Sequence, residues 1–248
     1  MKQSNNIYIY NNNFISLINL IQILIINKIK PLNIKDSFYN PNLLDNLIHL
    51  KIKEDNINNF INIIGKRNFK IIYYVYLSND INKELIIYYY VLNALKYNDK
   101  IVYMYNLNCV TKALKIYNYV KRENHRFKGF TRFKELKNNI LYAEINPENN
   151  ILELLSWHFK ERLNNECWII KDMNRNILSC YNKNKFIIIN GDEFKLIDLN
   201  LSDDEKYIEE LWKEFYNTIG IRQRENNKCR MNFMPKKYWQ YILEVSDL

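Results

Sequence analysis

Residues 109–135 read CVTKALKIYNYVKRENHRFKGFTRFKE and hold the clearest change of pattern in the chain. Before Gly129 the apolar residues recur at helical spacing, whereas after it apolar and polar residues alternate. This change predicts a helix over 109–126, then strands over 130–135 and 139–145. A helix that leads into a hairpin indicates an α+β fold with helices packed on an antiparallel sheet.

The predicted helix has two chemically different faces. At 100° per residue, one face gathers the apolar side chains Val110, Ala113, Leu114, Tyr117 and Val120. The opposite face carries the cations Lys115, Arg122 and Arg126. A row of cations is also typical of a helix face that is simply exposed to solvent. The interleaving of Lys128 and Arg132 with phenylalanines directly after it favours a surface that meets phosphates and bases.

The flanking segments predict further helices and strands. Before the basic helix, a short strand is expected over 7–10 and helices over 14–28, 42–50, 56–66 and 82–97. After the hairpin, a helix is expected from Pro147 to about Leu163, followed by strands over 167–172, 177–181 and 185–189. Ser202 to Glu205 resembles a capping box, and Pro235 fits the first position of a last helix.

The expected fold class is therefore α+β, with a helical N-terminal part, a central antiparallel sheet with packed helices, and a helical C-terminus. We expect one domain over 1–248. Its mainly helical sub-region would be 1–108, and 109–248 would hold the basic helix, the sheet and the C-terminal helices. A chain of 248 residues is long enough for one such domain, and its 48% apolar residues can form a core.

The formal net charge is +9, which is compatible with nucleic acid, an anionic membrane or an acidic protein partner. Two segments concentrate this charge. Residues 112–137 hold nine Lys and Arg against two acidic residues, and residues 222–237 hold six against one. In the second segment Arg222 and Arg224 can fork onto phosphates. Lys236 and Lys237 fall in the first turn of a helix, where a bound anion would explain them.

Several classes of protein are disfavoured by what the sequence lacks. The four cysteines have no metal-site spacing, so no metal is expected. The sequence shows no signal peptide, so we expect a reducing cytoplasm in which the thiols are free. The apolar run 14–26 is too short to span a bilayer, so no membrane segment is expected. The four glycines form no dinucleotide-binding or P-loop pattern, and G-x-S-x-G is absent. No cofactor is predicted.

Three titratable residues are the catalytic candidates: His125, Glu144 and His158. His125 stands beside Arg126, where it can instead orient a loop or contact phosphate. His158 lies on the apolar stripe of its predicted helix, the usual place of a core histidine, and Arg162 follows one turn later. Together with the cations named above, Arg162 completes the candidate nucleic-acid-binding set: Lys115, Arg122, Arg126, Lys128, Arg132, Arg162, Arg222, Arg224, Lys236 and Lys237.

A family resemblance rests on motifs spread along most of the chain, roughly residues 5–245. They are His125–Phe133 (HRFKGFTRF), Tyr142-Ala143 with Pro147, His158-Phe159 with Arg162, Trp168-Ile169-Ile170 with Asp172 and Arg175, Leu211-Trp212-Lys213, Ile221 with Arg224 and Asn226, and Met234–Trp239 (MPKKYW). The chain resembles a domain family of unknown function catalogued as probable DNA metabolism proteins. Tyr10–Phe14 (YNNNF) departs from the family's Tyr-Asp-Gly-Ser-Phe-like turn, because the acid and the glycine are lost.

The resemblance implies a setting in DNA repair or modification. Such proteins look like companions of a putative radical-SAM protein, and some are fused to a uracil-DNA glycosylase-like domain. This chain lacks the three-cysteine cluster of the first and the catalytic loops of the second. We therefore expect a DNA-binding accessory of a radical-SAM or glycosylase-like partner. Two alternatives stay open: an enzyme acting on DNA or a nucleotide through a pocket of His125, Glu144, His158 and Arg162, and a protein-interaction module without DNA contact.

Overall fold

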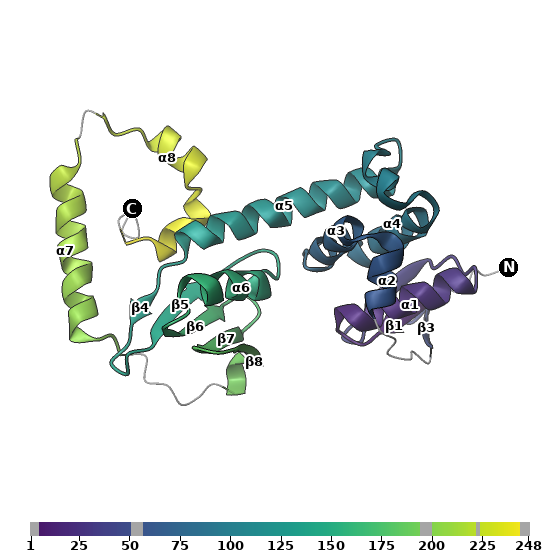
Figure 1. Cartoon of the computed structure of the whole chain (residues 1–248), viewed down its shortest axis with the longest axis horizontal. Coiled ribbons are helices and arrows are strands. Elements are labelled where there is room, and N and C mark those ends of the chain that lie inside the picture. The colour runs from purple at the N-terminus through teal and green to yellow at the C-terminus, as the bar shows by residue number, and fades with distance from the viewer. Residues whose placement is uncertain (1–4, 51–56, 194–199, 222–223, 244–248) are drawn as a thin grey trace. The chain divides into compact units, whose positions relative to one another are not determined.

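The computed structural model describes residues 5–50, 57–193, 200–221 and 224–243 (Figure 1). The chain divides into two compact units, Met1–Lys121 and Arg122–Leu248. The division falls inside helix α5 (Asn108–Phe130).

Unit one contains a parallel sheet with the strand order β2-β1-β3. Its elements are β1 (Asn5–Tyr10), α1 (Phe14–Ile26), β2 (Asn33–Asp36) and β3 (Asp45–His49). The side chain of Asn13 caps α1 by accepting a hydrogen bond from the Ser16 N–H at 2.7 Å. The helix predicted over 42–50 is wrong: its second half is β3, because these residues pair with the free edge of β1. A short Ile/Leu run does not distinguish a strand from a helix.

The rest of unit one is helical, as predicted. It comprises α2 (Ile57–Ile64), α3 (Lys66–Tyr76), α4 (Lys83–Tyr97) and η1 (Asn98–Tyr103). These helices share one core with α1, to which Leu20, Ile72 and Val91 contribute fully buried side chains. The apolar run 14–26 is thus α1, a buried helix. Among the described residues, no helix combines the length and apolarity that a bilayer span requires.

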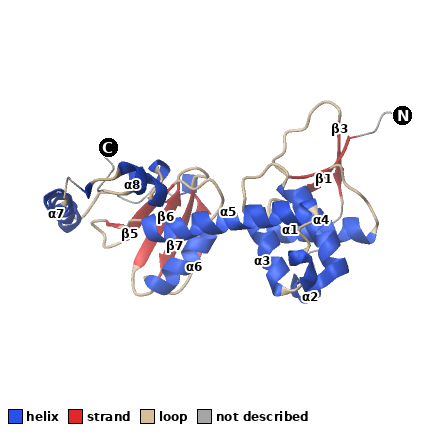
Figure 2. Ribbon diagram, turned by 90° about the horizontal axis from the view of Figure 1, so that it is seen from above, coloured by secondary structure: helices blue, strands red, loops and turns tan. Residues whose placement is uncertain are grey.

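Unit two is built on a five-stranded sheet with the order β4-β5-β6-β7-β8 (Figure 2). The strands are β4 (Lys134–Glu135), β5 (Leu141–Ile145), β6 (Cys167–Asp172), β7 (Ile177–Asn182) and β8 (Phe186–Asn190), with η2 (Gly191–Glu193) after them. The sheet is mixed and not antiparallel throughout, because β5 and β6 run parallel. The reason is α6 (Leu152–Arg162), which lies between them in sequence and provides the crossover that a parallel pair needs.

The two faces of this sheet have different covers. Helix α6 packs on one face, where the Ser156 hydroxyl donates to the Ser179 hydroxyl at 2.6 Å. The strand register places Tyr142 and Ile169 on the other face, where they form a second core with Leu136. A side chain on β5 therefore faces either α6 or this second core.

Helix α5 continues to Phe130, so the strand predicted over 130–135 is only β4. Phe127 and Phe130 stand three positions apart and contact the same ring, that of Tyr238. That shared packing requires helical spacing, which outweighs the local alternation of Phe with cations. The Thr131 N–H and hydroxyl both donate to the Phe127 carbonyl and end the helix.

Unit two ends with the helices α7 (Asp203–Ile219), α8 (Asn227–Phe233) and η4 (Lys236–Tyr241). As predicted, Ser202 caps α7 by accepting from the Glu205 N–H at 3.0 Å. The reciprocal bond of a capping box is not made, because the Ser202 N–H donates to the Glu135 carbonyl. Pro235 opens the last helix, which is a 3₁₀ helix. The α+β class with helices at both ends is confirmed.

Candidate nucleic-acid interface

The two basic segments meet at Tyr238. Its ring is 1% exposed and packs edge-on against Phe127, with a centroid distance of 5.1 Å, and at a tilt against Phe130, at 5.2 Å. Aromatic pairs of this geometry stabilise beyond the area they bury. Tyr238 therefore fixes η4 onto the last turns of α5, although the two segments lie far apart in the sequence.

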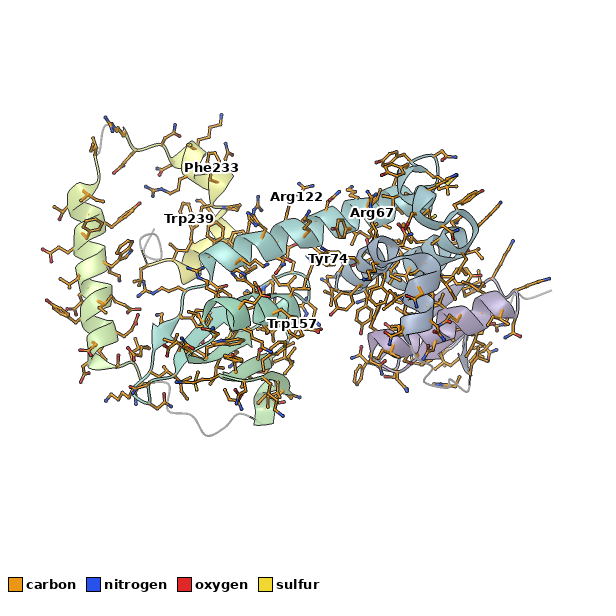
Figure 3. The ribbon with its side chains drawn as sticks, viewed as in Figure 1. Arg67, Tyr74, Arg122, Trp157, Phe233 and Trp239 are labelled. Atoms are coloured by element: carbon orange, nitrogen blue, oxygen red, sulfur yellow. The ribbon has the colours of Figure 1, made fainter. Side chains whose placement is uncertain are left out.

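Cations surround this aromatic contact. The Arg126 guanidinium lies 6.0 Å from the centroid of the Tyr238 ring, and the Lys237 ammonium lies 5.2 Å from the same centroid. Lys236 sits 5.5 Å from the ring of Trp239, and Arg122 is exposed one turn before Arg126. Figure 3 labels Arg122 on α5 and Trp239 on η4. We call Arg122, Arg126, Lys236, Lys237 and Trp239 the α5–η4 surface.

Acidic residues neutralise only part of this surface. The Lys237 ammonium lies 2.6 Å from a Glu148 oxygen and 3.8 Å from a Glu123 oxygen. By contrast, Arg122, Arg126 and Lys236 form no ion pair with any residue in the described parts of the chain. These three cations remain available to an anion.

Glu123, an acid inside the basic segment, has a structural role. Its carboxylate is buried and accepts from the Glu148 N–H at 3.0 Å, the Asn149 N–H at 3.0 Å and the Asn149 side-chain amide at 2.6 Å. These bonds attach the loop before α6 to α5 and satisfy the buried charge. Sequence reasoning missed this role, for which the only signal was an acid among cations.

Arg175 ties the same loop to the end of β6. Its guanidinium pairs with the buried Asp172 at 3.0 Å and donates to the carbonyls of Pro147 at 3.1 Å and Glu148 at 2.6 Å. Asp172 also accepts from the Asn174 N–H at 3.0 Å, the contact that an aspartate makes when it begins a turn. Several residues that carry the family resemblance thus hold the scaffold behind α5.

Arg132, in contrast to Arg126, is engaged by carboxylates. Its guanidinium lies 2.8 Å from Glu205 and 3.6 Å from Glu209, and Lys134 lies 3.2 Å from Glu209. Glu205 also accepts from the Glu135 N–H at 3.1 Å. These contacts fasten α7 to β4, so Arg132 is occupied within the fold and is a poor phosphate ligand.

A second group of basic residues lies at α6. Its members are Lys128, His158 and Arg162, which we call the α6 cluster. The pKa of His158 is lowered by partial burial and by the positive charges of Lys128 and Arg162, against a small opposing effect of Glu161. At 100° per residue Lys128 points away from Arg126 on α5, so this cluster is separate from the α5–η4 surface.

The remaining catalytic candidates do not join His158. Glu144 lies on the sheet face of Tyr142, whose hydroxyl donates to it at 2.9 Å, and this is the face opposite α6. His125 is exposed on α5. The structure therefore brings His158 and Arg162 together with Lys128, and it separates Glu144 from them.

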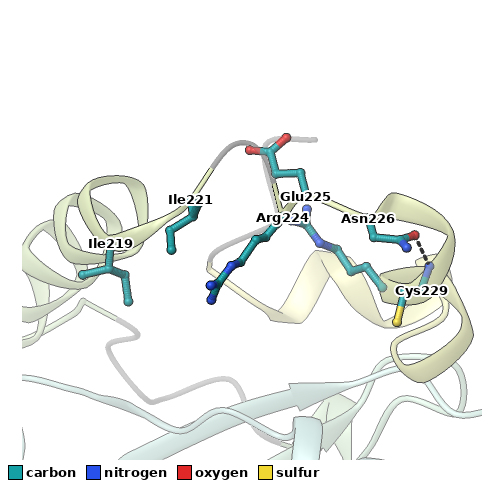
Figure 4. Close-up of a pocket in the computed structure, with 7 residues that line it drawn as sticks. Ile219, Ile221, Arg224, Glu225, Asn226 and Cys229 are labelled. Atoms are coloured by element: carbon teal, nitrogen blue, oxygen red, sulfur yellow. Dashed lines mark hydrogen bonds between the residues drawn. The ribbon is translucent and has the colours of Figure 1, made fainter.

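The other predicted cations are dispersed. Lys115 is exposed in unit one, and Arg222 lies outside the described residues. Arg224 lines a cavity of ≈ 410 Å³ between α7 and α8, where Ile221 and Cys229 also contribute walls (Figure 4). In the described ranges no three His, Cys, Asp or Glu side chains are arranged to hold a metal ion.

Comparison with known proteins assigns the chain to a family. Residues 81–244 match DUF4130, a domain of unknown function. The chain belongs to the DUF4130 family. The match includes α5, η4 and the whole of unit two up to residue 244, whereas the sheet of unit one and the Tyr10–Phe14 turn precede it. No curated protein and no solved structure matches this DUF4130 chain.

Proposed function

We propose that this DUF4130 protein binds nucleic acid through the α5–η4 surface. It would serve DNA repair or modification as the accessory of a radical-SAM or glycosylase-like partner. The observation that carries the proposal is the packing of Tyr238 against Phe127 and Phe130, which joins the two basic segments of the chain into one surface.

Physical chemistry favours nucleic acid among the possible anionic ligands of this surface. Arg122, Arg126 and Lys236 lack acidic partners among the described residues, so phosphates can replace their counterions at little cost. The half-buried Trp239 beside Lys236 offers a ring on which a base can stack. Because Tyr238 fixes the two segments, binding does not require them to be ordered first.

A binding assay tests this proposal directly. Arg126→Ala together with Lys236→Ala removes two unpaired cations from the surface. We expect affinity for single- or double-stranded DNA, measured by fluorescence anisotropy, to fall at least tenfold at low salt. The slope of log affinity against log salt should become shallower by roughly 1 to 2, since each phosphate contact contributes about one.

Lys185→Ala is the matched control, because Lys185 is an exposed cation of unit two between β7 and β8. Its loss should leave both affinity and slope unchanged. Arg132→Ala is unsuitable as a binding test, since it would release Glu205 and Glu209. DNA affinity that is the same in the double variant and the wild type at low salt would refute the proposal.

An enzyme remains the second candidate, and it now centres on the α6 cluster. Burial and the charges of Lys128 and Arg162 lower the pKa of His158, which favours its proton-accepting form near two groups that attract phosphate. Glu144 is not part of this candidate catalytic site, because it lies on the other sheet face. Nuclease or nucleotide hydrolysis that His158→Gln abolishes, with DNA affinity retained, would support it.

A further inference from the structure

Helix α7 exposes the apolar stripe that such a helix normally buries. Five large side chains recur at helical spacing and are each between 42% and 56% exposed: Ile208, Leu211, Trp212, Phe215 and Ile219. Trp212 and Phe215 lie against each other with centroids 5.7 Å apart. Contiguous exposed apolar side chains on a folded protein mark an interaction site.

The attachment of α7 explains how this stripe can stay exposed. The Ser202 N–H donates to the Glu135 carbonyl, and the carboxylates of Glu205 and Glu209 pair with Arg132 and Lys134. Polar contacts near its beginning thus hold the helix, and α7 lies at the margin of unit two, beyond β4 (Figure 1).

A cavity adjoins the stripe and can receive a side chain. It has a volume of ≈ 390 Å³, and its lining is mostly apolar: Ile208 and Trp212 of α7 contribute, as do Phe130, Met234 and Ile242. Arg132 also lines it, and its guanidinium is paired with Glu205 and Glu209 of α7. An apolar cavity beside exposed aromatic rings is the arrangement in which a partner's anchor residue contributes most to affinity.

The charge of α7 selects the occupant. The helix has six carboxylates and two lysines, whereas the chain as a whole has a net charge of +9. Asp204, Glu210 and Glu214 form no ion pair with any described residue. An acidic surface repels nucleic acid, and it would also repel the same helix of a second copy.

We propose that the α7 stripe and its adjoining cavity are the docking surface for a basic amphipathic helix of a partner protein. The partner helix presents apolar anchors at positions i, i+3, i+4 and i+7 and Lys or Arg at its flanks. This inference does not rest on nucleic-acid binding, because it uses none of the residues of the α5–η4 surface.

A defined peptide tests the chemistry of this surface. The probe is a fluorescent synthetic helix with Leu at the anchor spacing and Lys elsewhere, and the control peptide has Glu in place of every Lys. The full-length chain should bind the Lys peptide and not the Glu peptide in an anisotropy titration. Trp212→Ala combined with Phe215→Ala should weaken that binding at least tenfold.

Two further variants separate the docking surface from general effects. Glu210→Lys with Glu214→Lys keeps the stripe and should weaken binding of the Lys peptide, since it reverses the local charge. Trp157→Ala removes an exposed tryptophan from α6 and should change nothing. Circular dichroism of each variant checks folding, and these substitutions remove exposed side chains and not core.

Four outcomes would overturn the proposal. They are equal binding of the two peptides, unchanged binding by the Trp212→Ala, Phe215→Ala variant, self-association of the wild type that this variant abolishes in sedimentation velocity, and loss of DNA affinity in this variant. The third would assign the surface to a second copy and the fourth to nucleic acid. Loss of DNA affinity in Arg126→Ala, Lys236→Ala alone concerns only the proposed function.

Discussion

His158 lies among cations, and this setting couples its protonation to the stability of the protein. Its pKa is lowered in the folded state by burial and by the charges of Lys128 and Arg162, so the unfolded chain takes up a proton first as the pH falls. His158 therefore leaves the free energy of unfolding unchanged above the ordinary histidine pKa of about 6.5, and it lowers this free energy as the pH falls below that value. His158→Gln should therefore reduce the loss of stability between about pH 7 and pH 5.

Urea unfolding at several pH values measures this difference. Glu161 is the one acid whose charge acts on His158 and opposes the cations, so Glu161→Gln should enlarge the acid-side loss. The same pH dependence in wild type and His158→Gln would show that His158 is not held among cations.

The sequence predicted which segments hold the cations of the candidate interface. It did not predict which residues those cations contact. The sequence alone singles out Arg126 and Arg132 equally, since both belong to the segment in which cations and aromatic residues are interleaved. Arg132 is neutralised by Glu205 and Glu209, which come from a helix much later in the chain. Such pairing depends on the folded position of α7, and no local pattern encodes it.

A glycine substitution tests the assignment of the end of α5. Gly129 lies in the last helical turn, and a Cβ added there meets no atom within 4 Å. Gly129→Ala should raise the free energy of unfolding by about 0.5–1 kcal/mol, because it lowers the entropy of the unfolded chain and favours the helix. Thermal and urea unfolding measure the change.

The matched control is Gly65→Ala in unit one. Gly65 has φ of +84°, and a Cβ there would lie 2.6 Å from an Asp99 carboxylate oxygen. This substitution should destabilise the protein. Destabilisation by Gly129→Ala as well would contradict the helical assignment of residue 129.

Helices and strands could be predicted from the sequence where capping residues, turn residues or a sustained hydrophobic period mark them. The helix over 82–97, the cap at Ser202 and the three strands of the meander all follow from such signals. The parallel pairing of β5 with β6 did not, because strand direction depends on the path of the chain through α6. Strand β3 was mistaken for a helix since its short apolar run fits both periods.

The division of the chain into two units predicts which residues lose protection from hydrogen exchange when a core residue is substituted. Ile170 is fully buried on the α6 face of the sheet in unit two. Ile170→Ala should destabilise by about 3 kcal/mol, as large-to-small core substitutions do. Hydrogen exchange measured by mass spectrometry should accelerate in residues 122–248 and remain unchanged in the helices of unit one.

Ile87→Ala is the matched substitution, because Ile87 is fully buried in the core of unit one. It should accelerate exchange in α1–α4 and leave the strands β5–β8 protected. Equal acceleration in both units from either variant would mean that the two cores unfold together.

The net charge of the whole molecule conceals an uneven distribution. The sequence predicts a basic protein, yet the structure places an acidic helix, α7, in the same unit as the α5–η4 surface. Total charge says how the protein interacts with distant ions, whereas the fold decides which ligand each face attracts.

The Tyr238 contact also bears on the order of events during synthesis. Phe127 and Phe130 leave the ribosome long before Tyr238 is translated, so for that interval their rings lack the partner that covers them in the folded protein. A nascent chain at this stage already displays Arg122 and Arg126 without the lysines of η4.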